Sequence, residues 1–175
     1  WKGFDLLIEA AASLKTEKPL CLWIVGDGPM KEELLQESKK HFAEKKPDKV
    51  RFFPFTDDVR PYLWAADLFV QPSFYVPGSG GPEGFSLALV EALAAGLPAV
   101  AFDCGGAPDI IKEGINGWLA EPGNINSLTS ALQRALNHHP NDKMKLQAIK
   151  EATKLDVSCI ATLYLEVYQS FISPK

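Results

Sequence analysis

Short apolar runs alternate with segments of helical periodicity along most of the chain. The run at residues 20–25, LCLWIV, is continuous rather than alternating, which is typical of a strand covered on both faces. Four more strand-like runs follow, at residues 49–55, 67–71, 98–102 and 117–120. Because helix-like segments lie between these runs, the pattern predicts a parallel sheet with helices on both faces.

Beyond Gly123 the pattern becomes wholly helical. Three helical segments are predicted, at residues 124–139, 141–152 and 156–172. The predicted fold class is therefore α/β: a parallel β-sheet flanked by helices, with additional C-terminal helices. The length of 175 residues suits one domain with a full-sized core.

Composition and charge narrow the class of protein. The net charge of −4 lacks the basicity of a nucleic-acid binder, and no apolar stretch reaches membrane-spanning length. The cysteines are scattered and odd in number, so we expect no disulfide framework, no metal site and a reducing, cytoplasmic setting: Cys21, Cys104 and Cys159. The histidines fall at polar helix ends and are expected to be solvated: His41, His138 and His139.

Ligands of parallel sheets bind beyond the carboxyl ends of the strands, so the turns at those ends are the candidate sites. In the first turn, GDGP, Gly26 and Gly28 permit unusual backbone geometry and Pro29 suits the start of a helix. Such a helix start can hold a phosphate, although an ordinary tight turn is equally compatible with the residues. A dinucleotide fingerprint is disfavoured, because Lys31 stands where the third glycine would be.

The second candidate is PEGFSLALVEALAAGLP, at residues 82–98, which predicts a helix over residues 85–95. Helical spacing gives a core stripe at Leu87, Val90, Leu93 and Ala94. Glu91 falls on another side, which is lined by alanines, so we interpret it as an acceptor held in a recess. An ordinary surface carboxylate remains the alternative interpretation.

A second carboxylate, Glu83, precedes this helix by a few residues. Helix geometry separates it from Glu91 by about 12 Å along the axis, so the two cannot form a tight dyad. The free N–H groups of Gly84, Phe85 and Ser86 would face an anion at the helix start. The third turn, with Gly105 and Gly106 before a short helix, is also compatible with a phosphate or with a tight helix start.

Together these segments resemble the C-terminal, donor-binding domain of retaining glycosyltransferases of the GT-B fold, in the large family 4 group (glycosyl transferases group 1). The resemblance covers nearly the whole chain, and the E-x7-E block followed by G-x-P is its most specific part. The matching segments are KGFDLLIEA, GDGP, AADLFVQPS, EGFSLALVEALAAGLPAVAFDCGGAPDII and GINGWLAEPGNINSLTSAL.

The resemblance implies a Rossmann-like fold and a role for each candidate residue. Glu91 would accept from the ribose hydroxyls of a nucleotide-diphosphate sugar, and Glu83 would contact hydroxyls of the transferred sugar. The N–H groups of Gly84, Phe85 and Ser86 would hold the sugar or diphosphate, and Lys2 would pair with the diphosphate. The first turn, with Gly26 and Gly28, would also line the donor site. The family implies no required cofactor or metal.

Three departures from the family pattern affect the rim of the site. A nine-residue insertion occupies residues 74–82, Ser86 stands where glycine is common, and Asp109 replaces a frequent glutamate.

The resemblance also implies that residues 1–175 are one domain whose N-terminal, acceptor-binding partner domain is missing. We therefore expect the chain alone to bind nucleotide weakly and not to transfer sugar, and any peripheral membrane association to involve only the missing half. In this fold the final helix often crosses to that half, which would expose Tyr164, Tyr168 and Phe171; an ordinary core-facing stripe is the alternative. A non-catalytic nucleotide-binding or regulatory module of the same fold is the competing functional hypothesis.

Overall fold

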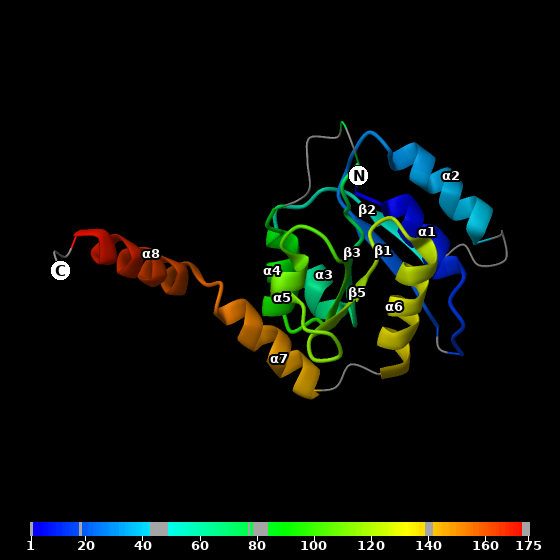
Figure 1. Cartoon of the computed structure of the whole chain (residues 1–175). Helices are drawn as coiled ribbons and strands as arrows, with labels where there is room; N and C mark the ends of the chain where they lie inside the picture. Colours follow the sequence, from blue (N-terminus) through cyan, green and yellow to red (C-terminus); the bar gives the residue numbers. More distant parts are fainter. Residues whose placement is uncertain are drawn as a thin grey trace.

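The computed structural model describes residues 2–17, 19–42, 49–76, 78, 84–138 and 142–172. Strands and helices alternate along the chain and end in three consecutive helices (Figure 1). The elements are α1 (Phe4–Ala12), β1 (Leu22–Val25), α2 (Lys31–His41), β2 (Val50–Phe53), α3 (Arg60–Ala65), β3 (Phe69–Gln71), α4 (Leu87–Ala94), β4 (Ala99–Phe102), α5 (Ala107–Ile110), β5 (Gly117–Ala120), α6 (Ile125–His138), α7 (Asp142–Thr153) and α8 (Val157–Ile172).

All strand pairs among the described residues are parallel. β1 pairs with β2, with Leu22 opposite Val50, whereas β3, β4 and β5 form a second sheet in which Ala99 lies opposite Gly117. The predicted parallel α/β fold is confirmed, with its strands divided between two sheets. Gly117 is required in this register, because a side chain there would collide with the Ala99 carbonyl oxygen of the paired strand.

Helices cover both faces of the strands. Figure 1 shows α1, α2 and α6 on one side and α4, α5 and α7 on the other. α1 packs against α2 and α6, and α4 packs against α7 and the strands β3 and β4. This layering buries the strand β4 completely, since its four residues lie between the two helical layers.

Helix α1 contributes to two hydrophobic clusters at once. Its Ile8 packs with residues of β1, α2 and β2, whereas its Leu7 and Ala10 pack with residues of β4, β5 and α6. Apolar side chains on adjacent positions of one helix therefore join the two sheets, which share no strand pairing among the described residues.

The predicted core stripe of α4 is partly wrong. Leu87 is 70% exposed and Ala94 is exposed, whereas the buried residues of this helix are Leu89, Ala92 and Leu93. The helix begins at Leu87 rather than Phe85, so Leu87 sits in the first turn, beyond the edge of the core. The inward face is consequently rotated toward Leu89.

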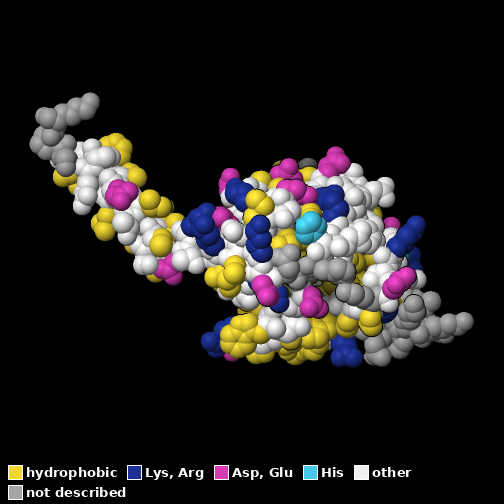
Figure 2. All heavy atoms as spheres, turned by 90° about the horizontal axis from the view of Figure 1, so that it is seen from below, with side chains coloured by type: hydrophobic (Ala, Val, Ile, Leu, Met, Phe, Trp, Pro, Cys, Tyr) yellow, Lys and Arg dark blue, Asp and Glu magenta, His cyan; other side chains and the backbone are white. Residues whose placement is uncertain are grey.

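The C-terminal helix α8 extends away from the body of the molecule and has no buried residue (Figure 1). Its exposed side chains include Tyr164, Tyr168 and Phe171, the last being 83% exposed, so the core-facing alternative is wrong for this chain. Figure 2 shows hydrophobic side chains along the length of the extension. Polar side chains at Ser158, Thr162, Glu166 and Ser170 follow one another at helical spacing.

The histidines, expected to be solvated, differ in exposure. His138 is exposed, and its ring contacts Trp118. His41 is only partly exposed and lies 3.2 Å from a Glu37 carboxylate oxygen, and His139 falls outside the described residues. Among the described residues, no helix combines the length and apolar character needed to cross a membrane.

The link formed by α1 can be tested with Ile8→Ala, which removes a fully buried side chain between β1, α2 and β2. We expect the free energy of unfolding in urea to fall by about 2–5 kcal/mol. Leu146→Ala, which truncates an exposed side chain on α7, is the control and should change the free energy of unfolding by less than about 0.5 kcal/mol. Equal effects of the two substitutions would contradict the role assigned to α1.

Candidate functional site

The amino end of α4 is the best-defined part of the site. Ser86 is buried, and its hydroxyl oxygen accepts a hydrogen bond of 3.2 Å from the Leu89 N–H. This cap satisfies one of the first N–H groups of the helix, whereas the geometry of a helix leaves those of Leu87 and Ala88 without acceptors inside it. Ser86 therefore acts as a helix cap, and the neighbouring N–H groups can receive an anion.

A close backbone contact fixes the loop before α4. A Cβ atom at Gly106 would lie 2.5 Å from the Gly84 carbonyl oxygen and 3.8 Å from the Phe85 Cα. The turn after β4 thus directly supports the residues that precede α4. Two of the predicted candidate turns, far apart in sequence, are brought together by this contact.

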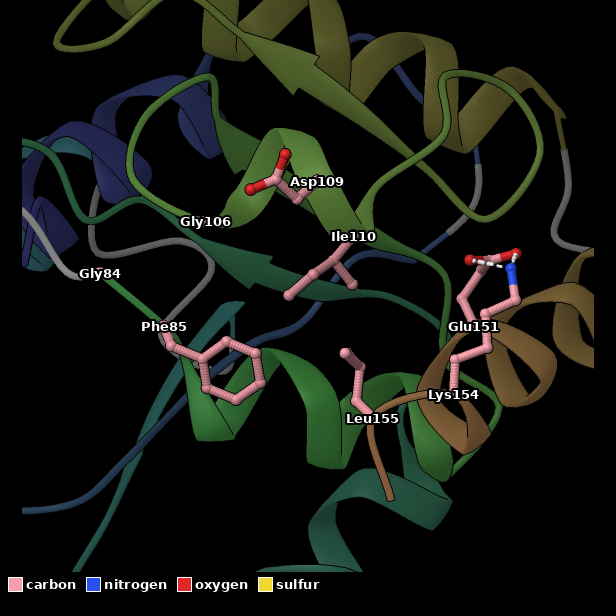
Figure 3. Close-up of a pocket in the computed structure, with 8 residues that line it drawn as sticks. All are labelled: Gly84, Phe85, Gly106, Asp109, Ile110, Glu151, Lys154 and Leu155. Atoms are coloured by element: carbon pink, nitrogen blue, oxygen red, sulfur yellow. Dashed lines mark hydrogen bonds and ion pairs between the residues drawn. The ribbon is translucent and has the colours of Figure 1, made fainter. Parts of the chain in front are cut away.

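A pocket of about 320 Å³ opens beside this contact (Figure 3). Phe85, Ile110 and Leu155 form its apolar walls, and the backbone at Gly84 and Gly106 forms another part. Its polar residues are Asp109, Glu151 and Lys154, of which the last two form an ion pair of 2.7 Å. The carboxyl end of α7 and the two residues that follow it therefore form one side of the pocket.

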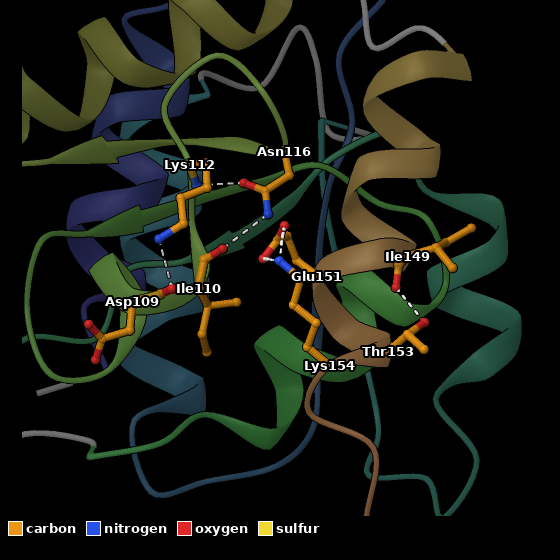
Figure 4. Close-up of polar contacts among 8 residues, drawn as sticks. All are labelled: Asp109, Ile110, Lys112, Asn116, Ile149, Glu151, Thr153 and Lys154. Carbon is orange, nitrogen blue, oxygen red and sulfur yellow. Dashed lines mark hydrogen bonds and ion pairs between the residues drawn. The ribbon is translucent and has the colours of Figure 1, made fainter. Parts of the chain in front are cut away.

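A polar network centred on the buried Asn116 holds α5 at this pocket (Figure 4). The Asn116 amide donates to the Ile110 carbonyl oxygen at 3.0 Å and its oxygen accepts from the Lys112 N–H at 2.6 Å. The Lys112 ammonium in turn donates to the Asp109 carbonyl oxygen at 3.0 Å. Asn116 is fully buried, so it fixes the end of α5 from within the protein. Sequence reasoning missed this residue, for which the available signal was an asparagine among the apolar residues of GINGWL, residues 114–119.

The ends of β3 and β4 meet around Ser86. A cavity of about 10 Å³ lies between Ser73, Ser86 and Cys104, together with Gln71, Ala101, Phe102 and Ala107. The Cys104 thiol donates to the Ser73 carbonyl oxygen at 3.3 Å. These contacts hold the cap of α4 against the carboxyl ends of two neighbouring strands.

Charge distinguishes the helix starts at the carboxyl ends of the strands. The first turn of α2 carries Glu32 and Glu33, and that of the four-residue α5 carries Asp109. The first turn of α4 carries no acidic residue. Because carboxylates at a helix start already occupy its positive end, α4 favours a bound anion more than α2 and α5 do. The first turns of α3 and α6 also lack acidic residues, so the Ser86 cap and the Gly84–Gly106 contact are what distinguish α4 from those two helices.

The first candidate turn contains a carboxylate that sequence reasoning did not single out. One oxygen of Asp27 accepts from the Phe55 backbone N–H at 2.7 Å, and the other accepts from the Lys31 ammonium at 2.6 Å. Hydrogen bonding from Lys31, followed by that from the Phe55 N–H, lowers the pKa of the Asp27 carboxyl below its ordinary value. Gly26, with φ of 125°, also donates its N–H to the Phe53 carbonyl oxygen. An aspartate four residues before a lysine was the available signal.

Lys2 lies near the carboxyl end of β3. The next residue, Gly3, has a φ of 66° and approaches Pro72 so closely that any side chain would collide with the Pro72 carbonyl oxygen. Since Pro72 directly follows β3, this contact places the start of α1 at the same end of the strands as Ser86.

Glu91 lies on the exposed side of α4. The alanines expected to line a recess around it differ in burial: Ala88 is exposed, Ala95 is partly exposed and Ala92 is buried. Among the described residues Glu91 therefore lies in the open, and its role as an acceptor stays a prediction. Glu83 lies outside the described residues, as do most residues of the insertion at 74–82. Within the described part of the chain, no group of three or more metal-ligating side chains occurs.

Comparisons with known proteins agree on one family. Residues 1–155 match the family described as Glycosyl transferases group 1. An uncharacterized glycosyltransferase of Haemophilus influenzae is 34% identical over 140 residues, which are 79% of this chain and 37% of that protein. The N-acetyl-alpha-D-glucosaminyl L-malate synthase of Bacillus anthracis is 29% identical over 167 residues, 92% of this chain and 41% of that protein.

Solved structures give the same result. A structure of Anabaena Alr3699/HepE in complex with UDP and glucose is similar with a TM-score of 0.78 and 27% identity, over 97% of this chain and 45% of that chain. A glycosyltransferase of Rickettsia africae matches all of this chain and 46% of its own, with a TM-score of 0.79 and 23% identity. The chain thus spans less than half the length of these proteins, and its architecture is that of GT-B glycosyltransferases.

The contact between Gly84 and Gly106 is tested by Gly106→Ala. The backbone at Gly106, with φ of −84°, accepts alanine without conformational strain, so the effect isolates the collision with Gly84. We expect the free energy of unfolding to fall by about 1–3 kcal/mol, as for other overpacked sites. Gly28→Ala, where a Cβ meets no atom within 4 Å, is the control and should be neutral or slightly stabilising. If Gly106→Ala unfolds with the same free energy as the wild type, the contact between Gly106 and Gly84 does not constrain the backbone at Gly84.

Proposed function

The chain belongs to the glycosyl transferases group 1 family, and from this membership we propose that it is the donor-binding domain of a retaining glycosyltransferase of family 4 type. Its substrate would be a nucleotide-diphosphate sugar, from which the whole enzyme transfers the sugar to an acceptor. The observation that supports this proposal most is the start of α4. It is capped by Ser86, carries no acidic side chain in its first turn and lies beside the Gly84–Gly106 contact.

The diphosphate of the donor would bind at the amino end of α4. N–H groups at Leu87 and Ala88 can donate to phosphate oxygens there, and the helix dipole favours the negative charge. Lys2 is proposed to add a cationic charge from the start of α1. When the bond to the sugar breaks, negative charge builds on the departing nucleoside diphosphate, and groups fixed in advance stabilise that charge more than water would.

The transferred sugar and the ribose would lie on either side of the diphosphate. Gly84 and Phe85 line the pocket beside α5, so the sugar would bind at the mouth of this pocket with Glu83 as a hydroxyl acceptor. Glu91, exposed on α4, would accept hydrogen bonds from the ribose hydroxyls. The complex of Anabaena Alr3699/HepE with UDP supports a nucleotide ligand, and the glycine turn at Gly26 and Gly28 would line the nucleoside side of the site.

We propose that a second domain of the same polypeptide completes the enzyme. The relatives are more than twice as long as the part of them that matches this chain. The match to the Rickettsia africae structure covers all of this chain, including its C-terminal helix. The exposed apolar side chains of α8 would pack on that domain, which would bind the acceptor. Residues 1–175 would then form one domain, which is the donor-binding half of the enzyme.

Glu91→Gln tests the ribose assignment. Removing the charge weakens hydrogen bonds from ribose hydroxyls, so we expect the affinity for a nucleoside diphosphate to fall about tenfold. Titration calorimetry measures the change, and the melting temperature should stay the same because Glu91 is exposed. Glu166→Gln on α8 is the matched control and should bind as the wild type does. Unchanged affinity in Glu91→Gln would refute the assignment.

The chain by itself should bind donor without transferring sugar. Transfer requires donor and acceptor in near-attack geometry, a contribution of about 7–11 kcal/mol that needs both binding sites. The measurement is sugar transfer by this chain beside the full-length protein, with the same donor and acceptor. Comparable turnover by the two would mean that an acceptor site lies within these residues.

A further inference from the structure

The turn after β1 is electrostatically unsuited to the diphosphate. Glu32 and Glu33 occupy the first turn of α2, and the ammonium of Lys31, the first residue of that helix, is already paired with the Asp27 carboxylate at 2.6 Å. A diphosphate at this helix start would meet like charges, which disfavour its binding. An uncharged part of the ligand is not subject to this repulsion, so the turn suits the base and not the phosphates.

The same turn is tied to the loop after β2 by the Asp27 side chain. One carboxylate oxygen holds the Phe55 N–H and the other holds the Lys31 ammonium, so a single residue connects β1, β2 and α2. The bond to Phe55 spans 28 positions of sequence. The phenyl ring of Phe55 is 69% exposed, and no Cβ contact restricts the space at Gly26 or Gly28. An exposed aromatic ring on a residue whose backbone is bonded to this turn can stack on a planar base.

From this arrangement we propose that Asp27 is a positioning residue that sets the selectivity of the site for the nucleotide base. The inference rests on the proposed function, because it concerns the nucleoside end of the same donor. Asp27 does not contact the diphosphate; it fixes the Phe55 backbone, from which the phenyl ring projects, relative to the turn at Gly26 and Gly28. The position of these two segments then determines which base fits between them.

A nearby carboxylate provides a matched control. The Asp58 carboxylate accepts from the Arg60 N–H at 3.1 Å and from the Arg60 guanidinium at 2.7 and 2.9 Å. Its side chain is 47% exposed and that of Asp27 is 48% exposed, but its bonds stay within three residues of sequence. Asp58→Ala therefore removes an equally exposed, equally hydrogen-bonded carboxylate without separating β1 from β2.

The experiment measures affinities of the wild type, Asp27→Ala and Asp58→Ala for UDP, ADP, GDP and CDP by calorimetry. The wild type should prefer one of the four, and Asp27→Ala should reduce that preference about tenfold, the effect of losing one charge-assisted hydrogen bond. Asp58→Ala should keep the preference within about twofold. If Asp27→Ala does not fold, Asp27→Asn preserves the volume of the side chain and should reduce the preference in the same direction.

The outcomes separate this inference from the proposed function. If Asp27→Ala weakens binding of all four nucleotides by the same factor, Asp27 supports the fold only and the inference is wrong, while the proposed function stands. A wild type that binds the four equally also overturns it, since there is then no selectivity to set. A wild type that binds none of them refutes the proposed function and this inference together.

Discussion

The packing of α1 between two separate parallel sheets is the constraint on which the rest of the structure depends. Ile8 faces the cluster of β1, α2 and β2, and its neighbours Leu7 and Ala10 face the cluster of β4, β5 and α6. At the start of the helix, the backbone of Gly3 contacts Pro72, the residue that follows β3. The turns that line the candidate site belong to both sheets, so their relative position depends on this one helix.

Given that frame, charge divides the site into regions of different chemistry. α4 starts with a buried serine cap and no acidic residue, whereas α2 starts among carboxylates. An elongated ligand with an anionic centre would consequently be oriented by repulsion at one helix as well as by attraction at the other. Gly106 supports the attractive end through backbone contact, and Asn116 stabilises α5 beside it from the interior.

The sequence predicted the features that depend on local pattern. The strands at residues 20–25 and 98–102 were predicted because continuous apolar runs are unmistakable when both faces are covered, and the glycine turns follow them directly. The inward face of α4 was misassigned, since Leu87 fits the stripe by spacing but lies before the core begins. The division into two sheets, the Asp27–Phe55 bond and the support from Asn116 depend on pairings between distant residues, which no local pattern contains.

The exposure of α8 also determines what a melting curve of this chain would report. α7 is anchored by Met144, Ala148 and Ala152, which pack into the body, so the cooperative unit extends to the end of that helix. α8 buries none of its side chains, and its helical hydrogen bonds are therefore held by local propensity alone. Its helix–coil transition would proceed independently of the rest, and circular dichroism would record it as a sloping baseline before the main transition.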